Sequence, residues 1–71
     1  MVDHLAIERD PAANAAYLAL TLIGPGAAVE TIPLHDRAGE LIGALDLDVD
    51  GCVLGIEFLD AAHRLPRPGD V

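Results

Sequence analysis

The stretch DLDVDGCVLGIE, residues 46–57, has carboxylates at the spacing of a calcium-binding loop. It reads D-x-D-x-D-G with a glutamate six residues after the glycine, which is the pattern of the twelve-residue EF-hand loop. Carboxylate oxygens are the ligands that Ca²⁺ prefers. A weaker form of this hypothesis is a calcium-binding or calcium-sensing site made by Asp46, Asp48 and Asp50 alone.

The residues around these aspartates favour a β-hairpin over an EF-hand. An EF-hand loop joins two helices, whereas both flanks here alternate as strands do. Asp50-Gly51 between two apolar runs is typical of a hairpin turn. Glu57 would then lie up the second strand, roughly 20 Å from the turn at about 3.3 Å per residue, too far to complete the site. We therefore predict a turn at residues 48–51 and no metal or other cofactor.

The inventory of side chains leaves little chemistry for an enzyme. The chain contains no serine and no lysine, which excludes serine nucleophiles, Schiff-base lysines and the lysine of phosphate-binding loops. Cys52 opens an apolar run, where a small buried residue is its usual role. His4, His35 and His63 share no metal-ligand spacing, although His63 lies three residues after Asp60 and could pair with it on a helical turn. We predict no catalytic residue and no enzymatic activity.

The elements that would carry these residues are mostly short strands. Alternation and turn residues predict strands over residues 3–9, 15–23, 28–34, 41–47 and 52–58. Residues 12–23 leave a helix open as an alternative, because Asp10 and Pro11 would begin one well. The alternating leucines from 18 to 22 favour the strand.

Three further residues refine the prediction. Pro33 cannot donate to a ladder and therefore marks an edge strand or a strand end, and Gly55 inside a strand indicates a bulge or close packing. Asp60 is predicted to be the N-cap of a short C-terminal helix. The predicted fold is α+β but mostly β, an antiparallel β-meander of about five short strands with a short C-terminal helix. It forms one domain, residues 1–71, with residues 1–2 and 67–71 frayed.

Size and composition predict a homodimer. A chain of 71 residues, 52% of them apolar, buries too little surface alone and gains stability by assembling. One cysteine allows no disulfide within the chain. The interface is predicted to bury the alternating apolar residues of two strands: Leu18, Leu20, Leu22, Leu54, Ile56 and Phe58.

The charge narrows the range of partners. Twelve acidic residues and four arginines give a formal charge of −8, which repels nucleic acid and anionic membranes but suits a basic partner protein. The N-terminal residues lack a signal-peptide pattern, and the longest apolar run is far shorter than a membrane span. A lone cysteine suits a reducing compartment, so a cytoplasmic location is expected.

Two segments together resemble a known family. They are ERDPAANAAYLAL, residues 8–20, and DLDVDGCVLGIEFLDAAHRLP, residues 46–66. The ordered pair resembles the small prokaryotic family named domain of unknown function 2283 (DUF2283). The resemblance implies a small β-rich domain with a C-terminal helical turn and no established activity, and it suggests an antitoxin-like binding role. We therefore expect a non-enzymatic protein-interaction module that acts as a homodimer.

Overall fold

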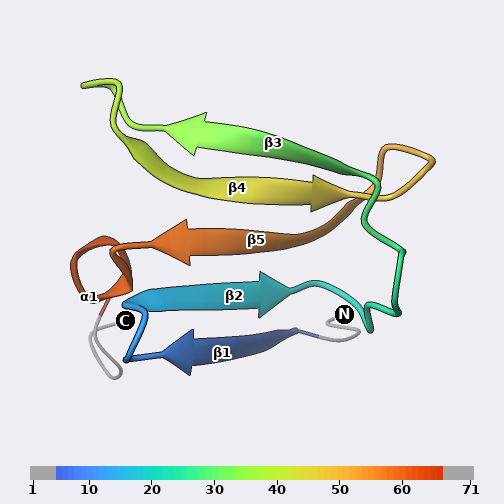
Figure 1. The fold of residues 1–71 in the computed structure, drawn as a ribbon, viewed down its shortest axis with the longest axis horizontal. Coiled ribbons are helices and arrows are strands. Elements are labelled where there is room, and N and C mark those ends of the chain that lie inside the picture. The colour runs from blue at the N-terminus through green and yellow to red at the C-terminus, as the bar shows by residue number, and fades with distance from the viewer. Residues whose placement is uncertain (1–4, 67–71) are drawn as a thin grey trace.

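The computed structural model describes residues 5–66, which form one open sheet of five antiparallel strands and one short helix (Figure 1). The elements are β1 (Ala6–Asp10), β2 (Ala15–Ala19), β3 (Glu30–His35), β4 (Leu41–Leu47), β5 (Val53–Leu59) and α1 (Ala61–Arg64). The predicted fold class is therefore confirmed. The predicted fraying concerns residues outside the described range. No helix within that range is long and apolar enough to cross a membrane.

The order of the strands differs from the predicted meander. In space it is β1-β2-β5-β4-β3, so β2 pairs with β5, and residues 20–29 run along one end of the sheet to the far edge (Figure 1). A meander would put β3 in the middle, where Pro33 could not donate to a second neighbour. The observed order places β3 at the edge, as Pro33 predicts.

The strand predicted over residues 15–23 is a strand, not a helix, but it ends at Ala19. Asp10 and Pro11 begin a turn instead of a helix: the Ala13 amide donates to Asp10 Oδ1 at 3.3 Å and the Asn14 amide to the Pro11 carbonyl at 3.2 Å. This turn joins β1 and β2 as a hairpin.

Helix α1 begins at the predicted place, but Asp60 does not cap it with its side chain. Asp60 has φ 51° and Asn14 has φ 50°, in the left-handed region that asparagine and aspartate tolerate better than most residues other than glycine. Asn14 supplies the cap instead: its carbonyl accepts from the Ala61 amide and its Oδ1 from the Ala62 amide, both at 2.9 Å. The turn after β1 therefore holds the helix after β5.

Alternation and register give the sheet one apolar face. A row across all five strands consists of Ile7, Leu18, Ile56, Leu45 and Ile32. The same face carries Arg9, Ala16, Glu30, Leu34, Gly43, Leu47, Leu54 and Phe58. Arg9 is the one arginine within the strands. It lies in the edge strand β1 and donates to the Pro66 carbonyl at 3.3 Å.

Among the described residues, little covers the apolar face. Within residues 5–66 the buried apolar residues are Ala16, Leu47, Leu54 and Ala61, and no large side chain is fully buried. Ile7 and Ile32 are 48% and 37% exposed. A domain normally buries a sheet face against a second layer, and the four residues of α1 at one end are too few to form one.

The opposite face is acidic, and we call it the acidic face. Register places the carboxylates of Glu8, Asp10, Asp46 and Glu57 on it, together with Tyr17. Small residues lie between them, among them Ala6, Ala19, Ala44 and Gly55. The sheet is therefore a single layer with two chemically different faces.

Candidate functional site

Tyr17 is the centre of the acidic face. From β2 its ring extends across β5 above Gly55, where an added Cβ would lie 2.6 Å from two ring carbons. Its hydroxyl donates to Asp46 Oδ2 on β4 at 2.8 Å, and Thr31 on β3 donates to Asp46 Oδ1 at the same distance. The close packing predicted for Gly55 is thus confirmed. One hydrogen-bonded chain links side chains of three strands, β2, β4 and β3, and passes over β5.

Burial and two neighbouring carboxylates, those of Asp46 and Glu57, make this phenol less acidic. Burial, the hydrogen bond to Asp46 and the negative charges of Asp46 and Glu57 raise the pKa of Tyr17 to about 12. Glu8 and Glu57 lie on either side of it, as its cross-strand neighbours. Within residues 5–66 neither glutamate has an ion-pair partner. The site therefore keeps a neutral phenol in a negative environment.

Titration of the phenol tests this geometry. Tyr17 is the only tyrosine and the chain has no tryptophan, so phenolate absorbance reports this side chain alone. We expect a midpoint at about pH 12 in the folded protein and about 10 in denaturant. Because the folded pKa is the higher one, this contribution to stability is complete below about pH 10 and is lost as the pH rises towards 12.

Asp46→Asn should lower that midpoint by removing a charge, but not fully to 10, because the ring remains partly buried. A midpoint near 10 in the folded wild-type protein would contradict the bond between Tyr17 and Asp46.

The structure does not assemble the calcium loop. Asp46 is held by Tyr17 and Thr31 on the acidic face. Asp48 Oδ1 accepts from the amides of Asp50 and Cys52, both at 2.9 Å, within the hairpin turn. Glu57 lies in the middle of β5, opposite Ala44. The hairpin prediction for residues 48–51 is confirmed, and within residues 5–66 no three acidic, histidine or cysteine side chains converge as metal ligands do.

Thermal unfolding in millimolar calcium should match unfolding in chelator. An ion at about 100 times its dissociation constant would stabilise the fold by roughly 2.7 kcal/mol, several degrees in a domain of this size. Paired melts at equal ionic strength check this, with magnesium as the control ion. A calcium-specific rise of several degrees would restore the ion-loop hypothesis.

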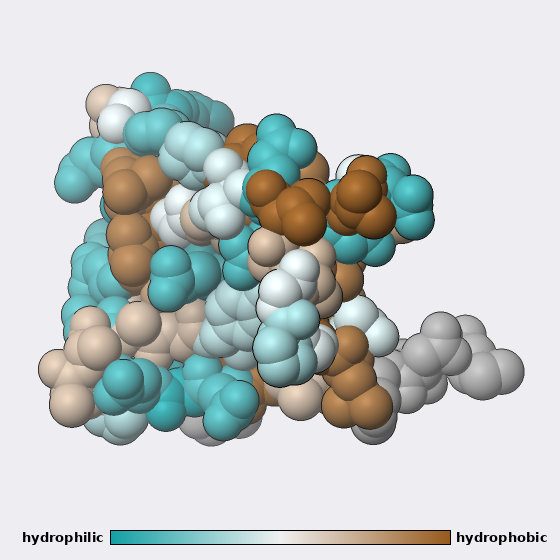
Figure 2. Space-filling view, turned by 45° about the vertical axis from the view of Figure 1, so that its right-hand side comes forward, coloured by the Kyte–Doolittle hydropathy of each residue, from teal (hydrophilic) through white to brown (hydrophobic). Residues whose placement is uncertain are grey.

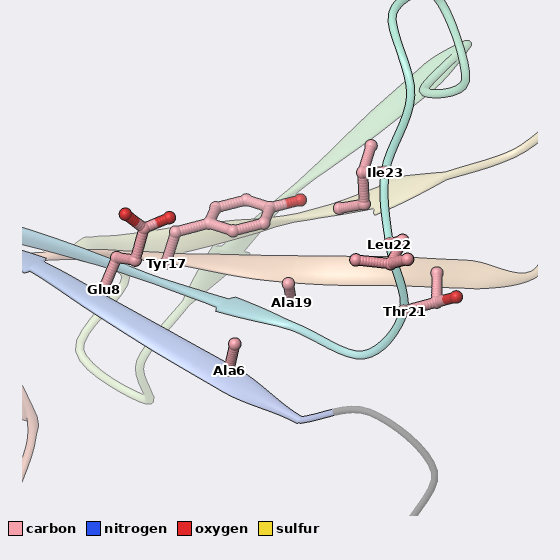
Figure 3. A pocket seen from close by; sticks show the side chains of 7 residues that line it. All are labelled: Ala6, Glu8, Tyr17, Ala19, Thr21, Leu22 and Ile23. Atoms are coloured by element: carbon pink, nitrogen blue, oxygen red, sulfur yellow. The ribbon is translucent and has the colours of Figure 1, made fainter.

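A groove of about 530 Å³ opens on the acidic face (Figure 3). It is lined by residues of β1, β2 and the connection that follows: Ala6, Glu8, Tyr17, Ala19, Thr21, Leu22 and Ile23. Figure 3 shows Glu8 and Tyr17 at one end, and the side chains of residues 21–23 at the other. Leu22 is 80% exposed there. The groove therefore combines a carboxylate with apolar walls.

Five of the six residues predicted for the interface share the apolar face. Register places Leu18, Leu54, Ile56 and Phe58 there. Leu20 joins them because its backbone amide donates a hydrogen bond to the Leu54 carbonyl at 2.9 Å. Leu22 is not among them, because β2 has ended and the chain turns towards the groove. Other large apolar side chains, including Val49 at 82% exposure, reach the surface near the β4–β5 turn, the end that comes forward in Figure 2.

Cys52 is exposed rather than buried. It belongs to the turn, not to β5, and its carbonyl accepts from the Asp48 amide at 2.9 Å. The prediction of a buried role was therefore wrong. His63 Nδ1 lies 3.3 Å from Asp60 Oδ2, which confirms the predicted pair. His35 is in the edge strand β3, and His4 lies outside the described residues.

Two polar residues make structural contacts that local sequence patterns do not predict. Asn14 Nδ2 donates to Asp60 Oδ1 at 2.9 Å, in addition to its capping bonds. Asp36, between β3 and β4, accepts from the amides of Glu40 and Ala38 and from Arg64 at 3.1 Å. The Glu40 amide is the main cause that lowers the pKa of Asp36. The bond between Asn14 and Asp60 and the bond between Asp36 and Arg64 each join segments that are distant in the sequence.

Comparison of the chain with models of known families, with curated proteins and with solved structures finds no significant match. The resemblance to domain of unknown function 2283 stays a prediction. Function must therefore be argued from the two faces of the sheet.

Proposed function

We propose that the protein is a non-enzymatic interaction module that works as a homodimer joined through its apolar face. The observation that carries this proposal is the apolar row across all five strands, which α1 leaves open. In a two-fold dimer the same face of each copy covers the other, so each chain supplies the second layer that its partner lacks.

The size of this face suits a dimer. Five strands about 4.8 Å apart and roughly 20 Å long give a flat area on the order of 500 Å² with their side chains. Two copies would then bury about 1,000 Å² or more, the lower limit for a specific interface. Four of the five acidic residues in the strands lie on the other face, and the fifth, Glu30, is at the end of the edge strand β3. Most of the strand carboxylates are therefore directed away from the contact.

The acidic face is then free for a partner of opposite charge. It carries four strand carboxylates, whereas the arginine within the strands, Arg9, is on the apolar face. Attraction of a basic protein fits this distribution and would steer its approach. Neutralising or scaffolding a basic partner, as an antitoxin does, is the function this arrangement supports best.

Ile56→Glu tests the dimer. Ile56 lies in the central strand and in the middle of the apolar row. A two-fold interface would bury two unpaired carboxylates there, at a cost of about 3 kcal/mol or more. We expect the dimer to dissociate at least 100-fold more readily than the wild type, measured by sedimentation equilibrium over a range of concentrations.

Val49→Glu is the matched control, because it makes a similar change at a turn residue that is 82% exposed. Ile7→Glu, in the edge strand, tests the same face with less risk to the fold. Circular dichroism confirms that each variant is folded. A wild-type monomer at 100 μM, or an Ile7→Glu protein that dimerises as well as Val49→Glu, would refute the proposal.

A further inference from the structure

We propose that the groove on the acidic face, between β1, β2 and residues 21–23, binds a segment of a basic partner in which an arginine or lysine stands beside aliphatic residues. This rests on the proposed function, because it assigns the basic partner to one place on the acidic face.

The floor and one wall of the groove suit aliphatic side chains. Ala6 and Ala19 are cross-strand partners, and two small residues side by side leave the floor low. At the far end Leu22 and Ile23 are 80% and 37% exposed. An aliphatic side chain that lies on these alanines and against these two residues would remove apolar surface of both partners from water.

The other end suits a cation. Glu8 lies there beside Tyr17, with Glu57 as the next neighbour across β2. A guanidinium or ammonium group can pair with a carboxylate and also lie against the phenol ring, which attracts cations through its π face. Because the Tyr17 hydroxyl already donates to Asp46, the ring is fixed in place before a ligand arrives.

The volume indicates how much of the partner enters. A groove of about 530 Å³ falls within the range of small-ligand sites, roughly 300–1,000 Å³. One arginine side chain would leave much of it empty, so a segment that contributes two or three side chains fits better. The basic residue supplies specificity and its aliphatic neighbours supply contact area.

Tyrosine fluorescence of the full chain measures this binding, because Tyr17 is the sole tyrosine and no tryptophan is present. The probe is acetyl-Val-Arg-Leu-amide, which is not fluorescent. The comparison peptides are acetyl-Val-Glu-Leu-amide, which reverses the charge, and acetyl-Gly-Arg-Gly-amide, which removes the aliphatic side chains. We expect saturable binding of the first peptide, at least tenfold tighter than that of either other peptide.

Two variants address the two ends of the groove. Ala6→Leu raises the floor of the groove and should lower the affinity for the first peptide at least tenfold. Glu8→Gln should lower that affinity at least fivefold. Glu40→Gln removes an exposed carboxylate outside the groove and should change the affinity less than twofold. Equal affinities for all three peptides, or equal losses in Glu8→Gln and Glu40→Gln, would overturn the proposal in favour of general charge attraction.

Sedimentation of the same samples separates this proposal from the dimer. A dimer that does not bind the first peptide overturns the groove assignment and leaves the dimer intact. A monomer that binds it with the expected selectivity supports the groove and overturns the dimer.

Discussion

Replacing Gly43 with alanine should cost more than about 3 kcal/mol and remove most of the stability of the folded protein. Gly43 is buried in β4, and an added Cβ would overlap the carbonyl oxygen of Glu57 in β5. Overpacking usually costs 1–3 kcal/mol, and more where a backbone must move. Here the obstacle is a main-chain atom of the central strand. A small domain has only about 5 kcal/mol to lose.

Urea denaturation followed by circular dichroism measures the loss. Gly24→Ala is the matched control, because its added Cβ would meet no atom within 4 Å. If Gly43→Ala and Gly24→Ala unfold at the same urea concentration, β4 and β5 do not approach as closely as described at this position.

Gly55→Ala is the second substitution with a large expected effect. Its Cβ would lie 2.6 Å from Cε2 and Cζ of Tyr17, so the ring must leave β5 and give up its bond to Asp46. A hydrogen bond to a charged group contributes about 1.5–3 kcal/mol, and we expect a loss of that size. The pKa of Tyr17 should also fall from about 12 towards its ordinary value near 10.

A double-mutant cycle identifies the cause of that loss. In Tyr17→Ala the ring is gone, so adding Gly55→Ala should cost much less than it does in the wild type. Strict additivity of the two changes would mean that Gly55 is required for another reason. Absorbance titration of the Gly55→Ala protein gives the independent readout, because a tyrosine displaced to solvent titrates near pH 10.

Much of the local structure could be predicted from the sequence, because its causes are local. The alternation of apolar and polar residues predicts the five strands, and Asp50-Gly51 predicts the hairpin. Pro33 predicts the edge position of β3. The predicted meander has the wrong strand order. Pro33 argues against a meander, because a meander puts the third strand in the centre of the sheet. Residue 33 therefore carried topological information that the prediction of a meander did not use.

The parts that could not be predicted depend on residues far apart in the sequence. Nothing around Asp60 shows that Asn14 will cap the helix that follows it. Nor does the D-x-D-x-D-G pattern show that Tyr17 and Thr31 will hold its first aspartate. The exposure of Cys52 follows from its place in the turn, where hydrophobic composition is a poor guide.

The strand order also determines at which step of folding most of the loop-closure entropy is lost. Strands β1 and β2 form a hairpin, and β3, β4 and β5 form a second unit of consecutive hairpins, so the pairings within each unit close short loops. The β2–β5 pairing alone joins the two units, and it brings together residues as far apart as Ala15 and Leu59. The loop-closure entropy is therefore concentrated in one docking step. Tyr17 over Gly55 and Asn14 against α1 both form in that step, so the contacts that complete the acidic face also complete the fold.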